Sequence, residues 1–170
     1  MKNFSIIVAA DEKNWIWKGN DLAWEIPSEM KFFTKTTKTC EEWKQNAVVM
    51  WRKTWESIPE KYRPLPGRKN FVLSSNNFSE DVKIFSDFEK ILEKISEDEE
   101  VGEIFVMWWW QIYSHVINHK NCSKIYFTKV LWDFDCDSFF PEIPEDFKIE
   151  NESEIFEENW IKFQFLEFIR

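Results

Sequence analysis

The chain has 170 residues and a formal net charge of −9, with 44% hydrophobic and 31% charged residues. This length and balance are typical of one globular domain with a sizeable core, and they exclude a disordered chain. The acidic net charge argues against a protein that binds the phosphate backbone of DNA or RNA, so we expect no nucleic-acid partner.

Five short, nearly continuous apolar runs punctuate the chain. Such runs are typical of strands that are buried on both faces of a parallel sheet. Beyond residue 130 the pattern changes to an alternation through Ile161–Phe165, as in antiparallel edge strands. The five expected strands are Phe4–Ala10, Ala47–Met50, Asn70–Ser74, Glu103–Met107 and Lys124–Val130.

The segments between these runs are predicted to be loops and helices. Residues 11–24 are polar and irregular, so we expect a long loop there. A helix is expected to begin at Pro27, because proline suits the first helical turn. Met30, Phe33 and Thr37 then fall near one face of that helix.

Three further helical patterns follow. The clearest has apolar residues at positions i, i+3, i+4 and i+7, namely Phe88, Ile91, Leu92 and Ile95. A short helical piece is expected over Thr54–Ile58, before a turn-rich loop at Pro59–Gly67, and another from Gln111 to about Val116. Strands separated by helices, with a hairpin-like end, predict a single α/β domain over residues 1–170. Its central sheet would be mainly parallel, with an antiparallel C-terminal strand and flanking helices.

The cysteines and apolar runs predict the compartment. Cys40, Cys122 and Cys136 are odd in number and match no zinc-site or redox-pair spacing, which favours reduced thiols in a cytosolic protein. The stretch Ile6–Ala10 is too short for a signal-peptide core, and no apolar run approaches the ~20 residues of a transmembrane helix. We therefore expect a cytoplasmic protein with no membrane partner.

Tryptophan and glycine occur in unusual numbers. The chain has 11 Trp and 3 Gly, whereas average glycine usage of about 7% predicts roughly 12. Three of the tryptophans, Trp108–Trp110, follow an expected strand and precede a helix start. Glycine is common at such a turn because the backbone bends sharply and approaches a phosphate closely.

Seven stretches that cover nearly the whole chain carry a family resemblance. They are Ile7–Ala9, Ile16–Pro27, Val48–Ile58, Arg63–Asn70, Leu73–Ser75, Val106–Tyr113 and Asp133–Pro141. Each is weak alone, but the ordered set is highly specific and resembles dihydrofolate reductase. The resemblance implies an NADPH-dependent enzyme that reduces 7,8-dihydrofolate to 5,6,7,8-tetrahydrofolate in one-carbon metabolism. Hydride would pass to C6 of the substrate and a proton to N5.

The departures from the family pattern are almost all of one kind. Tryptophan stands where the family has glycine at Trp17, Trp51 and Trp108–Trp110, and Trp15, Trp43, Trp132 and Trp160 lie in turn-like contexts where glycine also fits. Trp24 and Trp55, in contrast, match tryptophans of the family. We hypothesise that the gene encodes glycine with UGA codons that were read as tryptophan.

Glu29 is the candidate catalytic acid. It is the carboxylate with the most apolar neighbours in sequence, among them Ile26 and Phe33, and burial would raise its pKa toward neutrality. The resemblance implies that it hydrogen-bonds the pterin ring and helps to place a proton on N5. From the residues alone, a glutamate favoured by the helix dipole is the simpler interpretation. The resemblance adds three residues to the catalytic set: Leu22, Trp24 and Tyr113.

The resemblance also implies a binding site for the substrate's tail and its rings. Arg68 would pair with the α-carboxylate of the glutamate tail, since a planar guanidinium suits a carboxylate. Apolar walls would surround the pterin and benzoyl groups, although each wall residue is by itself equally typical of a core. The expected substrate-binding residues are Ile7, Val8, Ala9, Glu29, Met30, Phe33, Ile58, Leu65, Arg68, Met107 and Thr128.

The cofactor site is expected where strands meet helix starts. Backbone amides and the positive charges of Arg52 and Lys53 would hold the pyrophosphate and the 2′-phosphate, which favours NADPH over NADH. The expected cofactor-binding residues are Ala9, Ile16, Asn20, Leu22, Trp51, Arg52, Lys53, Thr54, Ser74, Ser75, Trp108, Trp109, Trp110, Gln111, Ile112, Tyr113 and Ser138.

Other interpretations remain open at this point. A reductase of the same fold could act on a pyrimidine of riboflavin synthesis, but the Trp24–Glu29 motif and Arg68 discriminate against it. If the tryptophans are genuine, the chain could be a binding protein that cannot hold the cofactor. His115 and His119 are four residues apart, but no third ligand is apparent, so we expect no metal site. Nothing in the sequence demands more than a monomer.

Overall fold

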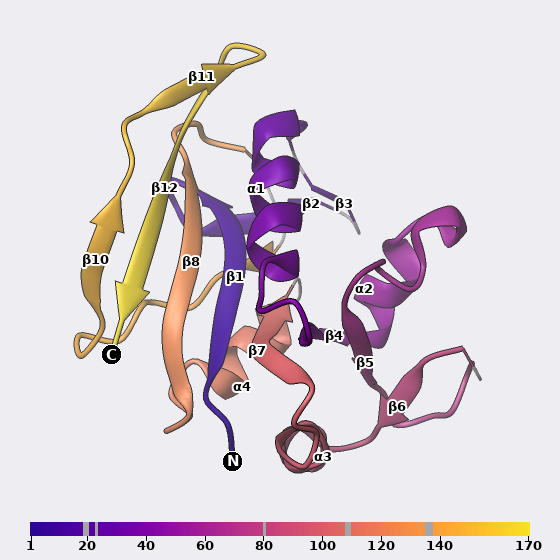
Figure 1. Ribbon diagram of the computed structural model, residues 1–170. Helices are drawn as coiled ribbons and strands as arrows, with labels where there is room; N and C mark the ends of the chain where they lie inside the picture. The colour runs from indigo at the N-terminus through magenta and orange to yellow at the C-terminus, as the bar shows by residue number, and fades with distance from the viewer. Residues whose placement is uncertain (19–20, 23, 80, 108–109, 135–137) are drawn as a thin grey trace.

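One large sheet organises the molecule. The computed structural model describes all residues except 19–20, 23, 80, 108–109 and 135–137 (Figure 1). The strands of the sheet are β1 (Phe4–Asp11), β4 (Gln45–Trp51), β5 (Lys69–Leu73), β6 (Lys83–Phe85), β7 (Val101–Met107), β8 (Cys122–Val130), β10 (Lys148–Glu152), β11 (Phe156–Glu158) and β12 (Ile161–Ile169). Their order is β10-β12-β8-β1-β7-β4-β5-β6, and β11 pairs with β12.

The strand directions confirm the predicted sheet. The strands from β8 through β1, β7, β4 and β5 to β6 run parallel to their neighbours. The C-terminal strand β12 runs antiparallel to β8, with Phe165 opposite Thr128, and β10 and β11 extend this antiparallel edge. All five predicted strands are present.

Helices cover both faces of the sheet (Figure 1). They are α1 (Pro27–Lys38), α2 (Arg52–Ser57), α3 (Phe88–Ser96) and α4 (Trp110–Val116), with a 3-10 turn at Glu60–Tyr62. The apolar side of α3 is buried as its spacing predicts, and the Asp87 carboxylate caps its first turn by accepting from the amides of Glu89 and Lys90. Helix α2 begins at Arg52, directly after β4, two residues earlier than predicted. None of the described helices is long and apolar enough to cross a membrane.

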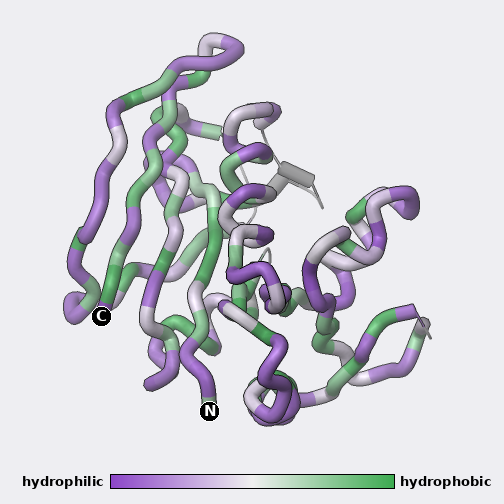
Figure 2. Tube along the Cα trace, in the orientation of Figure 1, coloured by the Kyte–Doolittle hydropathy of each residue, from purple (hydrophilic) through white to green (hydrophobic). Residues whose placement is uncertain are grey.

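The alternation of side chains along β1 separates two cores. Ile6 and Val8 pack in the cluster that contains the apolar residues of α3 and α4. Ile7 points to the other face, where it clusters with Phe33 of α1 and Trp55 of α2. The central strands are accordingly the most apolar part of the chain in Figure 2.

The expectation of an irregular loop over residues 11–24 was wrong. This segment contains β2 (Trp15–Lys18) and β3 (Asp21–Leu22), which form a small sheet with β9 (Ser138–Phe139). The buried Asp11 carboxylate anchors its start by accepting from the amides of Lys13 and Trp15, at 2.8 and 2.9 Å. The strands were missed because β2 finds a partner more than 100 residues away, which no local pattern reveals.

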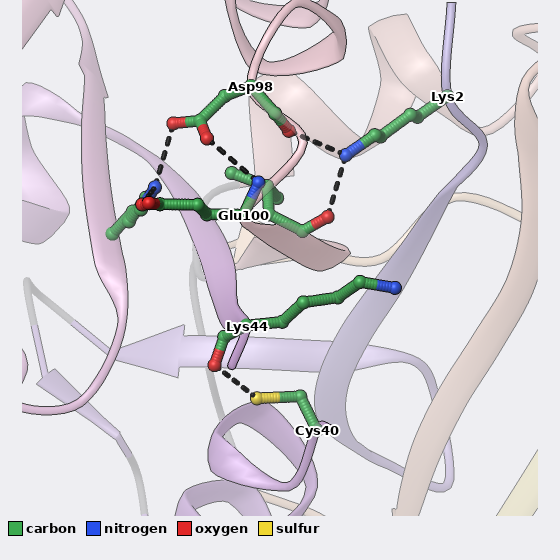
Figure 3. A network of polar contacts seen from close by, with 7 residues as sticks. Lys2, Cys40, Lys44, Asp98 and Glu100 are labelled. Atoms are coloured by element: carbon green, nitrogen blue, oxygen red, sulfur yellow. Dashed lines mark hydrogen bonds and ion pairs between the residues drawn. The ribbon is translucent and has the colours of Figure 1, made fainter. Parts of the chain in front are cut away.

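A polar network fixes the start of β1 against the turn between α3 and β7 (Figure 3). The Lys2 ammonium donates to the carbonyls of Asp98 and Val101, at 2.8 and 2.6 Å. The Asp98 carboxylate in turn pairs with Lys69 of β5 at 2.8 Å. The N-terminus, a helix end and a strand start are therefore joined at the amino edge of the sheet, away from the strand ends that carry the candidate site.

Candidate active site

Glu29 lies on the first turn of α1. Proline opens this helix after Ile26, and the side chain of Ile26 does not cap it. The Glu29 side chain is turned toward the protein, and the residue is only 6% exposed. Burial removes water from the carboxylate, which raises the pKa of Glu29 from 4.5 to about 7. Among the described residues no cation forms an ion pair with it.

A cavity of about 1080 Å³ runs along α1 and includes Glu29 in its wall. Trp24 lines the same cavity, and its buried indole Nε1 has no hydrogen-bond partner within the described part of the chain. A buried donor of this kind is expected to meet a ligand or a bridging water. The lining consists of Trp24, Glu25, Ile26, Pro27, Glu29, Met30, Lys31, Thr34, Lys35, Lys38 and Thr39.

The five predicted wall residues come together in one apolar cluster. They are at most 8% exposed and are Ile7, Phe33, Ile58, Leu65 and Met107. None of the five is among the residues that line the cavity along α1. Val8 points to the opposite face of the sheet, whereas Ala9 clusters with Trp24 and Ile26.

Arg68 is held from two sides. Its Nη1 donates to Thr37 Oγ1 of α1 at 2.8 Å, and its Nε donates to the carbonyl of Pro66 at 3.2 Å. The guanidinium carbon also lies 5.8 Å from the ring centroid of Phe33. The residue is 8% exposed, and this burial lowers the pKa of Arg68. A buried cation without a carboxylate partner is suited to receive one from a ligand.

Three other predicted site residues, Thr128, Tyr113 and Met30, differ in their burial and contacts. Thr128 is buried on β8, directly opposite Ala9 of β1. The Tyr113 hydroxyl donates to the carbonyl of Ile7 at 2.8 Å, which ties α4 to β1. Met30 is 40% exposed and lines the cavity, whereas Phe33 and Thr37 are buried. The expectation that these three residues share one face of the helix was therefore wrong for Met30.

A second cavity, of about 420 Å³, lies on the other face of the sheet. Trp51 at the end of β4 and Ile112 of α4, both predicted to bind the cofactor, line it together with Leu73 at the end of β5. In parallel sheets ligands bind beyond the carboxyl ends of the strands, and this cavity lies at such ends. His115, His119 and the cap of α3 complete its wall, and the prediction did not include them.

The polar residues predicted beside the cofactor have local partners. Arg52 at the start of α2 pairs with Glu56 at 2.7 Å, and Lys53 is exposed next to it. Thr54 is buried at 1% exposure. The Ser74 hydroxyl bonds to the backbone of Asn76, while Ser75 is exposed.

The remaining predicted cofactor residues belong to the small sheet, to the start of α4 or to the segments outside the described residues. Asn20, Trp108 and Trp109 lie outside the described residues. Leu22 belongs to β3, and Trp110 and Gln111 begin α4. Ile16 is buried on β2, and Ser138 on β9 pairs with that strand.

Comparison with known proteins places these features in a family. The sequence profile described as dihydrofolate reductase matches residues 3–170. The dihydrofolate reductase of Drosophila melanogaster is 39% identical over 97% of this chain and 96% of its own length, and that of Aedes albopictus is 36% identical over the same shares. The bifunctional dihydrofolate reductase-thymidylate synthase of Glycine max is 38% identical over 87% of this chain, which spans 29% of that protein.

The chain belongs to the dihydrofolate reductase family. Enzymes of this family use NADPH, and the second cavity fits part of that cofactor. Its apolar wall, including Leu73 and Ile112, suits an aromatic base, and the start of α2 next to it carries two cations. Trp51 is the misfit, because its half-buried indole packs against the core and takes up room in the wall of this cavity.

Proposed function

We propose that this chain reduces 7,8-dihydrofolate to 5,6,7,8-tetrahydrofolate with NADPH, and that Glu29 is its catalytic acid. The observation that carries the assignment is a carboxyl group that is 6% exposed in the wall of a cavity of about 1080 Å³ and whose pKa burial raises to about 7. At neutral pH such a group exists in both protonation states, so it can both accept and supply a proton.

Glu29 hydrogen-bonds the pterin ring and helps to place the proton on N5. Trp24 supports this role, because its unpartnered Nε1 supplies a donor in the same cavity. The apolar cluster under α1 keeps water away from the ring and thereby maintains the raised pKa of the acid. Leu22 and Tyr113 complete the catalytic set, and Tyr113 acts by holding the start of α4 against β1.

Arg68 binds the α-carboxylate of the substrate's glutamate tail. The contacts with Thr37 and Pro66 fix the guanidinium, so little side-chain freedom is lost when the tail binds. The walls described above, with Met30 and Thr128, hold the rings between Arg68 and Glu29.

NADPH supplies the hydride that reaches C6 of the substrate. Leu73 and Ile112 would hold its adenosine end, with Trp51 beside them narrowing the space, and Arg52 and Lys53 would face its phosphates. Thr54 of α2 and Ser74 and Ser75 after β5 would add hydroxyl groups beside the phosphates, and Ala9, Ile16 and Ser138 would contact the cofactor elsewhere.

We further propose that the chain acts as one domain over residues 1–170, as a monomer, in the cytoplasm. The continuous sheet from β1 to β12 supports a single domain. Light scattering at micromolar concentration tests the monomer, and a mass of 41–42 kDa, twice that of the 20.8 kDa chain, would contradict it.

The test is turnover of dihydrofolate at millimolar NADPH by the chain, by Glu29→Gln and by the control Glu93→Gln on the exposed side of α3. Loss of a general acid lowers kcat by about 10²–10⁴-fold. We expect this loss for Glu29→Gln, with the control unchanged and a group titrating near pH 7 in the active enzyme. Equal kcat in the three proteins would refute the role of Glu29.

A further inference from the structure

The first turn of α1 contains one backbone amide that the helix itself leaves without an acceptor. Pro27 has no amide hydrogen. The carbonyl of Ile26 accepts from the amides of Glu29 and Met30, at 3.0 and 3.3 Å. The amide of Ser28 remains, because the side chain of Ile26 has no atom that accepts a hydrogen bond. An unsatisfied amide at the start of a helix is costly, so an acceptor for Ser28 has to come from outside the helix.

That acceptor is Glu158, which is 130 positions away in the sequence. Its Oε2 accepts from the amide of Ser28 at 2.8 Å. Glu158 is the last residue of β11 and lies opposite Ile161 of β12, so the hairpin of these two strands brings the carboxylate to the start of α1 (Figure 1). A carboxylate at the positive end of a helix dipole forms a charge-assisted hydrogen bond, which is stronger than a bond between neutral groups.

Two further contacts join the same hairpin to the start of α1. Asn159, in the turn of the hairpin, donates from Nδ2 to the carbonyl of Glu25 at 3.3 Å. Phe32, three residues after Glu29, stacks on Phe165 of β12 with the ring centroids 4.2 Å apart. The hairpin therefore holds the chain on both sides of Glu29. A shift of the first turn would move the Glu29 carboxylate within the cavity wall.

We propose that Glu158 is a positioning residue, whose bond to the amide of Ser28 fixes the first turn of α1 and thereby holds the Glu29 carboxylate where the pterin ring binds. The inference rests on the proposed function, in which Glu29 helps to place the proton on N5. Glu158 is not among the residues that line the cavity, so it acts through the helix. Proton transfer requires donor and acceptor within hydrogen-bond reach, and a misplacement of about 1 Å can lower a rate about 100-fold.

The first experiment measures turnover of dihydrofolate at millimolar NADPH by the chain, by Glu158→Ala and by Glu158→Gln. Alanine removes the acceptor, so kcat should fall by about 10-fold while KM for dihydrofolate stays within about twofold. Glutamine keeps a neutral acceptor at the same reach, so it should retain at least about a third of kcat. The control is Glu157→Ala, which makes the same change at the exposed neighbour on β11 and should leave kcat unchanged.

A double-mutant cycle separates positioning from a general loss of structure. Glu158→Ala is combined with Glu29→Gln, and its effect on kcat is compared with its effect on the chain. If Glu158 acts through Glu29, its removal should lower kcat by less than about twofold once Glu29 has been replaced. The same loss of about 10-fold with and without Glu29 would show a structural role only and would overturn the inference.

The remaining outcomes are also decisive. A kcat of Glu158→Ala equal to that of the chain would overturn the inference. If urea unfolding shows that Glu158→Ala is not folded, Glu158→Asp replaces it, because its carboxylate is one methylene shorter and loses the 2.8 Å bond to Ser28. A kcat of Glu158→Asp equal to that of the chain would then overturn the inference. An undiminished kcat of Glu29→Gln would instead refute the proposed function, and the inference with it.

Discussion

The two cavities differ in what their function requires of the sequence. The proposed substrate side depends on the identity of particular side chains, namely Trp24 and Glu29 in the wall of the cavity along α1 and Arg68, which bonds to Thr37 of that helix. The cavity at the ends of β4 and β5 would need small residues that let a dinucleotide approach the backbone, and there Trp51 places an indole in the wall. The comparison shows that the substrate side of a two-ligand site can contain the side chains that its chemistry needs while a bulky side chain narrows the cofactor side.

The same comparison explains why the fold accommodates so many tryptophans. Trp43, Trp132 and Trp160 are 63%, 56% and 88% exposed, so their indoles do not enter the core. Trp24 and Trp55 are buried instead, at 6% and 4% exposure. The indoles of Trp43, Trp132 and Trp160 therefore lie outside the packing of the sheet, whereas Trp51 packs against it.

The largest expected effect concerns stability and the charge of Glu29. Because burial raises its pKa from 4.5 to about 7, the folded protein keeps a proton that the unfolded chain has released between these pH values. Stability from this group is therefore fully present below pH 4.5 and is lost as the pH rises through 7. Glu29→Gln removes the charge, so at pH 8 it should be more stable than the chain by up to about 3 kcal/mol. Urea unfolding at pH 4 and pH 8 tests this, and an identical pH dependence of both proteins would contradict it.

The second prediction concerns substitutions that make room in the proposed cofactor site. Glycine at Trp51 and Trp108–Trp110 should strengthen NADPH binding by about 100-fold, because overpacking by bulky side chains costs about 1–3 kcal/mol. Isothermal titration gives the dissociation constants, and Trp43→Gly is the control, since its exposed indole lies outside both cavities. Tight binding of NADPH by the unsubstituted chain would show that the indoles do not obstruct it.

The third prediction concerns the substrate side. Arg68→Leu should raise KM for dihydrofolate by about 10–30-fold, because a charge-assisted hydrogen bond is lost, and should leave kcat within about twofold. Arg68→Lys should recover only part of the loss, because it cannot form the bidentate pair. An analogue without the glutamate tail should bind all three proteins equally. A KM that is the same in Arg68→Leu would remove Arg68 from the site.

The smallest expected effect concerns a turn that lines neither cavity. Asn159 and Trp160 form the two-residue turn between β11 and β12, with φ of 53° and 66°. Such a turn favours asparagine followed by glycine, and a left-handed conformation costs other residues about 1–2 kcal/mol. Trp160→Gly should therefore stabilise the protein by about 1 kcal/mol. A lower free energy of unfolding in this variant would contradict the interpretation.

The sequence predicts those features that depend on neighbours along the chain. Apolar runs identify the buried strands, spacing identifies α3, and the apolar neighbours of Glu29 single out this acid. The small sheet was missed because β2 and β9 are distant in sequence. The contact of Arg68 with Thr37 of α1 was also missed, because the two residues are 31 positions apart in the sequence and only the fold brings them together.

The most direct test compares two purified proteins in dihydrofolate-dependent oxidation of NADPH. One is the chain as it stands, and the other carries glycine at the nine tryptophans other than Trp24 and Trp55. The two-cavity account predicts turnover in the glycine protein at least about 10-fold faster at limiting NADPH, since the substrate side is the same in both. Equal rates, or no turnover by either folded protein, would contradict it.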